Sequence, residues 1–437
     1  SHSDHSVHKA RFETVCKLRE ELGVNIATLL DTKGPEVRLK NFKDHKPVTI
    51  KDGDTFTLTT REVEGDETIC SITFPQLPKD VSVGTRILIN DGNIELKATR
   101  VDNTDIVCEV IHGGVVSDHK GINVPDVNLS MPYISDADMS DLEFGAKMGF
   151  DYIAASFVRT GADVIYLRKF TQSLGWFNPR IIAKIENAQG VANIDEILDA
   201  ADGIMVARGD MGVEIPFEQI PAIQKELIRK AYNAGKNVIT ATQMLESMIT
   251  NARPTRAEIT DVANAIYDGS SAIMLSGETA AGKYPVEAVK TMSLIAETTE
   301  KDIDYISRFK KRADERNSSI TDAISHATVT TAHDLNAVAI LTVTKGGTTA
   351  RTLSKFRPNC LIIALTTDDT TYHQLSLSWG IRAGVIEEKT NTDELIRHAL
   401  ERSVELGYLK KGDLVVITAG VPLGMSGTTN LLKVERA

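Results

Sequence analysis

The chain has 437 residues, of which 42% are hydrophobic and 25% are charged. These values are ordinary for a soluble globular protein, and the length predicts about two to four domains. The net charge of −11 at pH 7 argues against non-specific binding of nucleic acid, although a local basic site for phosphate is compatible with it. The sequence has no run of about 18 apolar residues, no signal-peptide pattern and no metal spacing among its four cysteines. We therefore predict a cytoplasmic protein that binds neither membranes nor nucleic acid.

The first 23 residues carry apolar side chains at helical spacing and predict an amphipathic helix. A short apolar strand is expected at 26–30. From 37 to 127 the pattern changes to short alternating runs separated by Asp-Gly and Gly-Gly pairs, which is typical of a small β-barrel or sandwich. Because this region interrupts an α/β pattern, we expect it to be an inserted domain. Its clearest runs are 55–59, 86–89 and 105–110.

Strands and helices alternate again from about residue 136. Helical patterns such as 221–234 and 256–267 separate the apolar β-type runs. This alternation predicts a parallel sheet, and with the strand at 26–30 it gives six βα units, two fewer than a closed eight-stranded barrel needs. The predicted strands are 152–158, 181–186, 203–206, 238–242 and 272–276.

A polar stretch at 308–319 is the expected linker to a second α/β region. The order of elements in that region predicts an open, doubly wound sheet in a separate domain. The predicted strands are 337–343, 361–365, 384–386 and 414–418.

Charged residues follow two neighbouring apolar runs, in I-I-A-K-I-E-N at 181–187 and G-I-M-V-A-R-G-D at 203–210. Lys184 and Glu186 are two residues apart, so they point to the same face of a strand. Asp210 ends the next strand, and neighbouring strands lie only about 4.8 Å apart. A cation and two carboxylates at the mouth of a barrel suit Mg²⁺ or Mn²⁺ and an anionic substrate. A structural ion pair at the barrel rim also explains this pattern, and the pattern alone does not decide.

Small residues and residues with a hydroxyl group follow other predicted strands, and we expect them at the same end of the barrel. Gly209 and Gly212 flank Asp210 and let the backbone approach a ligand, although a tight strand–helix turn needs the same residues. Thr242 ends V-I-T-A-T-Q, and Ser156 occupies the matching place in A-A-S-F, where a hydroxyl can bind substrate. One such residue is usually part of a turn, but four polar strand ends in register favour an active site.

The segment D-T-K-G-P-E-V-R at 31–38 lies where the inserted β region begins. Oxygen atoms of Asp31 and Thr32 at a strand end can bind a cation, and Arg38 can bind phosphate. The segment is also a boundary between domains, which is compatible with both roles.

Two loops rich in glycine, serine and threonine occur in the last domain. The first, T-V-T-K-G-G-T-T-A-R at 342–351, predicts a strand, a turn and a helix start that can hold a phosphate. The second is G-M-S-G-T-T-N at 424–430. One such loop is more often a turn and helix cap, but two in a domain without catalytic groups favour a regulatory site. The candidate effector residues are Thr344, Lys345, Gly346, Gly347, Thr348, Thr349, Ser426, Gly427 and Thr428.

Together these segments closely resemble pyruvate kinase, and the resemblance spans nearly the whole chain. The loop at 424–430 is similar to the bacterial type. The matching segments are L-D-T-K-G-P-E-V-R at 30–38, K-G-I-N-V-P at 120–125, A-K-I-E-N at 183–187, V-A-R-G-D-M-G-V-E-I-P at 206–216, A-T-Q-M-L-E-S-M at 241–248, R-P-T-R-A-E at 253–258, D-V-A-N-A at 261–265 and I-M-L-S-G-E-T-A-A-G-K-Y-P at 273–285.

The resemblance implies a TIM-type (β/α)₈ barrel, an all-β lid inserted after its third strand, and a C-terminal α/β domain with a mostly parallel sheet. We expect the barrel domain at 1–36 and 128–307, the lid at 37–127 and the C-terminal domain at 308–437. The implied reaction is the glycolytic transfer of a phosphoryl group from phosphoenolpyruvate to ADP, which gives pyruvate and ATP. It requires Mg²⁺ (or Mn²⁺) and K⁺. Family members are usually homotetramers, and a phosphorylated effector is expected at the C-terminal domain.

The resemblance also assigns roles to individual residues. Lys184 stabilises the transferring phosphoryl group and the enolate oxygen, and Thr242 belongs with it at the catalytic centre. Glu36 is similar to its counterpart in the K⁺-dependent type. The remaining implied roles are Mg²⁺ ligands for Glu186 and Asp210, substrate contacts for Gly209, Asp210 and Thr242, nucleotide contacts for Arg38, Lys120 and His2, and K⁺ ligands for Ser1, Asp31 and Thr32.

The start of the chain departs from the family pattern. Ser1-His2 resembles the end of an N-F-S-H segment that follows two further strands in the family. We therefore expect a truncated chain without the first two barrel strands, an active-site arginine and an asparagine K⁺ ligand. Open barrel edges are a folding liability, and the sequence leaves the activity of the chain as it stands open.

Two other functions compete with this interpretation. A metal-dependent aldolase or lyase that forms a pyruvate enolate shares the Lys/Glu/Asp geometry, but it does not explain the inserted β region or the second α/β region. A non-catalytic protein that binds a phosphorylated metabolite is disfavoured by the intact set of Lys184, Glu186, Asp210 and Thr242, although it stays open for a truncated chain.

Overall fold

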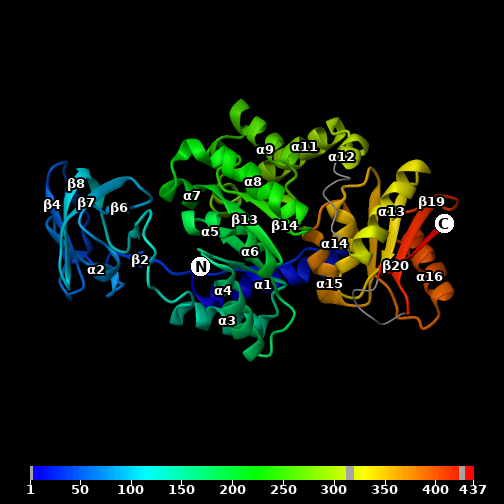
Figure 1. Cartoon of the computed structure of the whole chain (residues 1–437), viewed down its shortest axis with the longest axis horizontal. Helices are drawn as coiled ribbons and strands as arrows, with labels where there is room; N and C mark the ends of the chain where they lie inside the picture. Colours follow the sequence, from blue (N-terminus) through cyan, green and yellow to red (C-terminus); the bar gives the residue numbers. More distant parts are fainter. Residues whose placement is uncertain (1–2, 312–318, 423–428) are drawn as a thin grey trace.

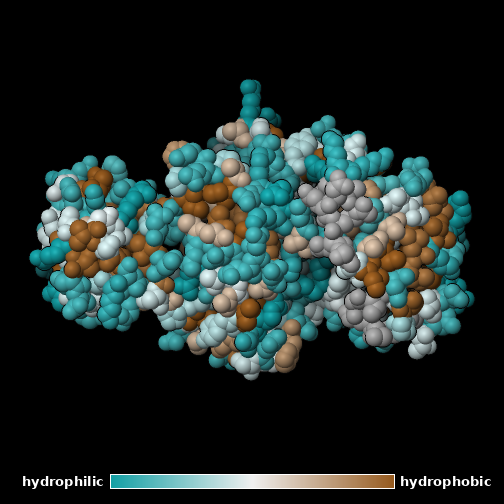
Figure 2. All heavy atoms as spheres, in the orientation of Figure 1, coloured by the Kyte–Doolittle hydropathy of each residue, from teal (hydrophilic) through white to brown (hydrophobic). Residues whose placement is uncertain are grey.

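The computed structural model describes residues 3–311, 319–422 and 429–437. Figure 1 shows three parts in a row: an all-β lid at one end, a sheet surrounded by helices in the middle, and an α/β domain at the other end. Within the described part of the chain, no helix is both long enough and apolar enough to cross a membrane. The face of the molecule shown in Figure 2 is largely hydrophilic, with separate apolar areas on each of the three parts.

The central domain is built on one parallel sheet. Its strands follow the order β1-β11-β12-β13-β14-β15, so the predicted six βα units are confirmed over the described residues. The four inner strands β11 to β14 are rich in Ile, Val and Ala and are buried on both faces, as expected for parallel strands covered by helices, whereas the edge strands β1 and β15 are partly exposed. Their bounds are β1 Leu29–Asp31, β11 Tyr152–Ala155, β12 Arg180–Ile185, β13 Gly203–Ala207, β14 Asn237–Ala241 and β15 Ala272–Ile273.

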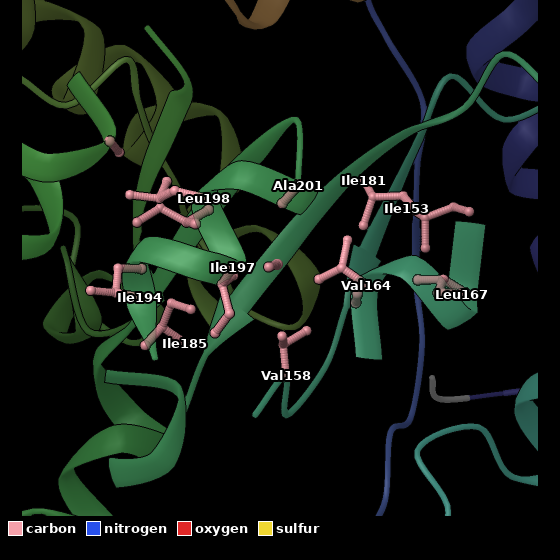
Figure 3. Packing of buried hydrophobic residues seen from close by; sticks show 14 of the residues in the cluster. Ile153, Val158, Val164, Leu167, Ile181, Ile185, Ile194, Ile197, Leu198 and Ala201 are labelled. Atoms are coloured by element: carbon pink, nitrogen blue, oxygen red, sulfur yellow. The ribbon is translucent and has the colours of Figure 1, made fainter. Parts of the chain in front are cut away.

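Helices cover the outer face of this sheet. Figure 3 shows Ile153 and Ile181 of the strands pointing toward Val164 and Leu167 of the helix that follows β11. Each such buried aliphatic side chain contributes about 1.5–3 kcal/mol to stability. The helices are α1 His5–Leu22, α3 Asp136–Met148, α4 Gly161–Ser173, α5 Ala188–Ala192, α6 Ile194–Ala200, α7 Arg208–Glu214, α8 Ile220–Asn233, α9 Arg256–Asp268, α10 Gly277–Ala280, α11 Pro285–Asp302 and α12 Tyr305–Lys311, with 3₁₀ turns η2 Phe217–Gln219 and η3 Glu246–Ile249.

The inserted region is all-β, as predicted, apart from one helical turn and one 3₁₀ turn. A seven-stranded sheet has the order β2-β10-β6-β7-β8-β4-β5, and β3 pairs with β9 in a second sheet. Alternating residues of these strands form an apolar core of their own. The elements are β2 Val37–Arg38, η1 Lys43–His45, β3 Val48–Ile50, β4 Thr55–Thr59, β5 Ile69–Ser71, α2 Leu77–Asp80, β6 Arg86–Ile89, β7 Ile94–Val101, β8 Asp105–His112, β9 Gly114–Val116 and β10 Gly121–Asn123.

The C-terminal domain has a mostly parallel sheet of order β18-β17-β16-β19-β20. The last strand runs antiparallel to β19 and was not among the predicted strands. The expected linker at 308–319 begins too early, because α12 continues to Lys311; residues 312–318 lie outside the described part. The elements are α13 Ile320–Asp334, β16 Ala339–Val343, α14 Thr348–Lys355, β17 Leu361–Thr366, α15 Asp369–Gln374, η4 Leu375–Leu377, β18 Ile381–Val385, α16 Thr392–Glu405, β19 Leu414–Gly420 and β20 Thr429–Arg436.

Polar side chains join the C-terminal domain to the amino ends of the barrel strands. The hydroxyl of Tyr152 donates to the carbonyl of Gln374 at 2.6 Å, and Nε of Arg180 donates to Gln374 Oε1 at 3.1 Å. Gln374 in turn donates to the carbonyl of Asp151 at 3.0 Å. The amino ends of the strands are therefore occupied, whereas their carboxyl ends face the lid (Figure 1). In parallel barrels the carboxyl ends carry the active site.

Candidate active site

Lys184 lies at the centre of a group of oxygen atoms at the carboxyl end of the sheet. Its Nζ is 3.0 Å from Glu186 Oε1 and 3.2 Å from Asp31 Oδ1, and it donates to Ser156 Oγ at 2.8 Å. Burial disfavours its charged form, but the two carboxylates outweigh burial and raise the pKa of Lys184. The ammonium group is therefore protonated at neutral pH and can act as a fixed positive charge, not as a base.

Glu186 is 1% exposed, and its surroundings change the pKa of its carboxyl group. Burial raises the pKa of Glu186 to about 7, and the charge of Asp210 adds to this rise, although Lys184 opposes it. Oε2 accepts a hydrogen bond from the Phe157 N–H at 2.6 Å. Oε1 is fully buried and accepts no hydrogen bond of good geometry, despite its ion pair with Lys184. A buried carboxylate oxygen without a hydrogen bond suits a cation ligand.

The donor set fits a hard divalent cation. Glu186 and Asp210 offer carboxylate oxygens, the ligands that Mg²⁺ and Mn²⁺ prefer. Over residues 3–311, 319–422 and 429–437, no group of three or more His, Cys, Asp or Glu side chains could hold a metal by itself. A Mg²⁺ ion at this place would therefore complete its coordination with water or substrate oxygens, as is usual in phosphoryl-transfer sites.

Ser156 has a different position from the one expected for a substrate contact. Its side chain is 1% exposed, and its hydroxyl donates to the carbonyl of Thr32 at 2.7 Å while accepting from Lys184. It therefore holds the lysine. Gly34 (φ 75°) packs directly against Ser156. A Cβ atom at residue 34 would lie 2.9 Å from the Ser156 carbonyl oxygen.

Gly209 and Gly212, which flank Asp210, lie inside helix α7, and the tight strand–helix turn given as the alternative explanation is not found at these glycines. Helix α7 begins at Arg208, directly after β13. The N–H of Gly209 donates to Thr242 Oγ1 at 2.8 Å, so the residue before Asp210 is bound to the end of the neighbouring strand β14. The structure thus brings Gly209, Asp210 and Thr242 to one edge of the sheet, beside the group around Lys184.

A cleft of about 560 Å³ separates the lid from this edge of the barrel. Arg38 and Lys120 line it from the lid, and Asp210 and Glu214 line it from α7. Arg38 is already partnered, since its Nε donates to Glu36 Oε2 at 2.8 Å. Glu36, expected near K⁺, therefore forms an ion pair with the predicted nucleotide contact.

Glu214, which was not among the predicted site residues, lies at the boundary between lid and barrel. Asn123 of the lid donates from Nδ2 to Glu214 Oε1 at 3.4 Å. Burial raises the pKa of Glu214 to about 7, and the charge of Asp126 adds to the rise. The motif V-A-R-G-D-M-G-V-E contained this residue, but no sequence signal indicated that its side chain faces the lid.

The predicted K⁺ ligands are only partly described. Asp31 contacts Lys184, as given above. Thr32 Oγ1 donates to the carbonyl of Ala154 at 3.3 Å and accepts from the Ser156 N–H at 3.0 Å. The candidate K⁺ ligand Ser1 and nucleotide contact His2 lie outside the described residues.

The first candidate effector loop packs against the barrel. Gly347 (φ 77°) precedes α14, and its N–H donates to Thr344 Oγ1 at 3.1 Å. The carbonyl of Gly346 accepts from Arg180 of β12 at 3.2 Å, and Arg351 also donates to it. Arg351 Nη1 is buried and has no hydrogen-bond partner. The loop thus connects α14 to the barrel, whereas the second candidate stretch, Ser426, Gly427 and Thr428, lies outside the described residues.

The fold and the site define a barrel enzyme whose lysine-and-carboxylate centre is covered by an inserted lid. Comparisons with known proteins identify the family. The model of the pyruvate kinase barrel domain matches residues 1–289, and that of the pyruvate kinase alpha/beta domain matches residues 322–435. The chain therefore belongs to the pyruvate kinase family.

Individual relatives agree over the whole chain. A pyruvate kinase from Clostridium acetobutylicum is 48% identical over 436 residues, which cover 100% of this chain and 92% of that protein. One from Geobacillus stearothermophilus is also 48% identical, with 100% of this chain and 74% of that protein covered. The crystal structure of a pyruvate kinase from Cryptosporidium parvum, 38% identical, superposes with a TM-score of 0.93 and covers 100% of this chain and 89% of that one. The expected truncation stays a prediction.

Proposed function

We propose that the cleft between lid and barrel is the active site for the pyruvate kinase reaction. This reaction transfers a phosphoryl group from phosphoenolpyruvate to ADP and gives pyruvate and ATP. The observation that carries the proposal is the pairing of a buried, protonated Lys184 with a buried Glu186 that has an oxygen without a hydrogen bond. Such an arrangement suits a site that neutralises transferred phosphate charge, not one that performs covalent catalysis.

In this proposal Glu186 and Asp210 hold the divalent cation, Mg²⁺ or Mn²⁺. When bound, the cation supplies Lewis-acid charge to phosphoryl oxygens. Lys184 places its ammonium beside the bond that breaks between phosphorus and the enol oxygen, where negative charge develops. Its three oxygen partners fix the position of Nζ before substrate binds, so little reorganisation is needed in the transition state.

The lid and the neighbouring strand end complete the proposed site. Gly209, Asp210 and Thr242 contact the substrate, while Arg38 and Lys120 contact nucleotide phosphates from the lid. The cleft of about 560 Å³ lies between Arg38 and Lys120 of the lid and Asp210 of α7. Lid closure would exclude water and so favour transfer to ADP over hydrolysis.

We further propose that K⁺ binds beside Asp31 and Thr32. The side chain of Asp31 is 40% exposed and lies 3.2 Å from Lys184, so a monovalent cation there would add positive charge next to the reacting phosphoryl group. Turnover in KCl should exceed turnover in LiCl at equal ionic strength. Equal rates in the two salts would contradict this assignment.

The C-terminal loop of Thr344 to Thr349 is the proposed site of a phosphorylated effector. Its support is the helix start at α14 and the nearby buried cation of Arg351, whose Nη1 has no hydrogen-bond partner. Glucose 6-phosphate, ribose 5-phosphate and AMP can be tested by melting temperature. At about 100 times its Kd, a ligand stabilises the native state by about 2.7 kcal/mol. A shift that Lys345→Ala abolishes would support the site, and no shift with any of the three would contradict it.

We propose a cytoplasmic homotetramer whose domains meet near residues 36, 127 and 307. Phe217 is 81% exposed beside a groove of about 900 Å³ between α7, α8 and α9, which suits contact with a second copy. Light scattering should give a mass four times that of the 47.7 kDa chain. A monomer mass at micromolar concentration would contradict the assembly.

The assignment of the cation ligands can be tested without turnover. Binding of Mn²⁺ to the full chain, followed by electron paramagnetic resonance, should weaken at least about tenfold in Glu186→Gln and in Asp210→Asn. Glu218→Gln, an exposed carboxylate beyond α7, is the matched control and should bind like the parent chain. Unchanged Mn²⁺ affinity in both site variants would refute the proposed ligands.

A further inference from the structure

Two successive residues after β14 adopt a backbone conformation that residues other than glycine rarely take. Thr242 has a φ of 69° and Gln243 a φ of 54°, both in the left-handed region. This conformation is especially unfavourable for a β-branched residue such as threonine. Strain of this kind costs about 1–3 kcal/mol per residue and persists only where the surroundings fix it. The turn therefore needs a group that holds it.

The guanidinium of Arg208 holds this turn. Its Nη2 donates to the carbonyl of Thr242 at 2.6 Å, and Nε donates to the carbonyls of Ala241 at 3.3 Å and Thr242 at 3.2 Å. Nη1 donates to both carboxylate oxygens of Asp261, each at 2.7 Å. The Arg208 side chain is 11% exposed, so water competes little for these bonds. A planar fork of donors suits this double task, which a single ammonium cannot perform.

The backbone beside Arg208 holds the same threonine from another direction. Strands β13 and β14 end in register, so the first residue of α7 lies opposite the turn. The N–H of Gly209 donates to Thr242 Oγ1 at 2.8 Å. Consecutive residues of α7 therefore bind the carbonyl and the hydroxyl of Thr242, and the next residue is Asp210.

We propose that Arg208 is a positioning residue for phosphoryl transfer. It fixes the left-handed turn and thereby keeps the Thr242 hydroxyl on the Gly209 amide, next to Asp210. Arg208 acts through Thr242, and Asp261 of α9 anchors its guanidinium. This inference rests on the proposed role of Thr242, so the test includes that residue by itself.

The test is a double-mutant cycle on turnover in the full chain. Arg208→Ala and Thr242→Ala should each lower kcat by about a hundredfold, the loss expected when a reacting group is misplaced by about 1 Å. The KM for ADP should stay within about threefold. Because both changes remove the same function, the kcat of the double variant should lie within about threefold of the kcat of the less active single variant.

A purely structural ion pair predicts other outcomes. If Arg208 and Asp261 form only a structural ion pair, Arg208→Ala should lower the melting temperature but keep kcat close to that of the parent chain, and the losses in kcat should multiply in the double variant. Either of these two results for kcat would overturn the proposal. Added guanidinium chloride at millimolar concentration should restore part of the turnover of Arg208→Ala. Arg208→Lys, which keeps charge but lacks the fork, should keep its fold and lose about tenfold in kcat. The proposal would also be overturned if guanidinium did not restore turnover of Arg208→Ala and Arg208→Lys kept the kcat of the parent chain.

The controls separate the possible failures. Arg229→Ala removes an exposed arginine of α8 and should leave kcat and KM unchanged. If Thr242→Ala is fully active, the proposed role of Thr242 and this inference both fail. If Thr242→Ala is impaired while Arg208→Ala is active, only the positioning role of Arg208 fails.

Discussion

Replacement of Lys184 by methionine removes the ammonium group and keeps most of the apolar stem. In the native structure Nζ contacts Glu186 at 3.0 Å, Asp31 at 3.2 Å and Ser156 at 2.8 Å. The side chain is only 15% exposed, so its charge acts in a medium of low effective dielectric. The variant should therefore lose most of the stabilisation that the Lys184 ammonium gives to the negative charge of the phosphoryl group during transfer.

The expected loss can be bounded from similar sites. Removal of one preorganised donor to a developing oxyanion costs about 10²–10³ in kcat, or about 2.7–4 kcal/mol. Lys184 carries a full charge and is mostly buried, so we expect a loss near the upper bound, about a thousandfold. A second effect follows at Glu186. Loss of Lys184 removes the charge that opposes the rise of its pKa, so that pKa should exceed its present value of about 7.

The assay is pyruvate formation coupled to NADH oxidation, with Mn²⁺ binding measured in parallel by electron paramagnetic resonance. We expect kcat to fall by about a thousandfold while Mn²⁺ still binds, more weakly at pH 7 than at pH 9, since Glu186 must be ionised to act as a ligand. Lys169→Met, an exposed lysine of α4, is the control. Turnover of Lys184→Met within about tenfold of the parent chain would refute the role of this charge.

Three further predictions concern stability and binding. Burial raises the pKa of Glu214 to about 7 from 4.5, so the native state binds its proton more tightly, and the free energy of unfolding falls as pH rises between these values. Glu214→Gln should therefore match the parent chain near pH 4.5 and exceed it by up to about 3 kcal/mol at pH 8 in urea unfolding. Gly34→Ala should lower stability by about 1–3 kcal/mol and also reduce kcat, since its Cβ would press on Ser156, which holds the catalytic lysine. Lys120→Ala should raise the KM for ADP by about tenfold with a smaller change in kcat.

Matched variants make these predictions decisive. Glu218→Gln changes an exposed carboxyl and should show no stability difference that depends on pH. Gly23→Ala introduces a side chain at a φ of 62° with no atom within 4 Å, so it measures backbone strain without the clash. Lys97→Ala removes an exposed lysine of the lid and should leave the KM for ADP unchanged. If any site variant behaves like its control, the corresponding prediction is wrong.

The centre of the site was predictable because strand geometry is simple. Lys184 and Glu186 share a face as a consequence of the two-residue period of a strand. Asp210 and Thr242 reach the same edge because parallel strands in sequence order place their carboxyl ends side by side. Apolar runs rich in Ile, Val and Ala also located the strands of the sheet, and the runs 181–186, 203–206 and 238–242 agree with β12, β13 and β14 to within one residue. The predicted strands 152–158 and 272–276 extend three residues too far, because β11 ends at Ala155 and β15 at Ile273. Strand β1 begins at Leu29 and not at 26, since Thr28 is hydrogen-bonded to Asp151.

Other contacts depend on backbone turns and on long side chains, which leave little trace in one sequence. The left-handed turn at Thr242 determines where the carbonyls lie that Arg208 binds, and nothing in T-Q-M predicts that turn. Glu214 meets Asn123 only because the lid folds back over α7. The ion pair of Glu36 and Arg38 was within reach of sequence reasoning, since residues two apart on an extended segment share a face.

In the proposed reaction a phosphoryl group moves directly between two bound substrates at the carboxyl end of the sheet, beside Lys184. Phosphorus NMR of the full chain with phosphoenolpyruvate, ADP, Mg²⁺ and K⁺ tests it most directly. The phosphoenolpyruvate signal should decay as the γ-phosphate signal of ATP grows in equal amount, and Lys184→Met should suppress both changes. Decay into inorganic phosphate, or no decay at all, would contradict direct phosphoryl transfer at this site.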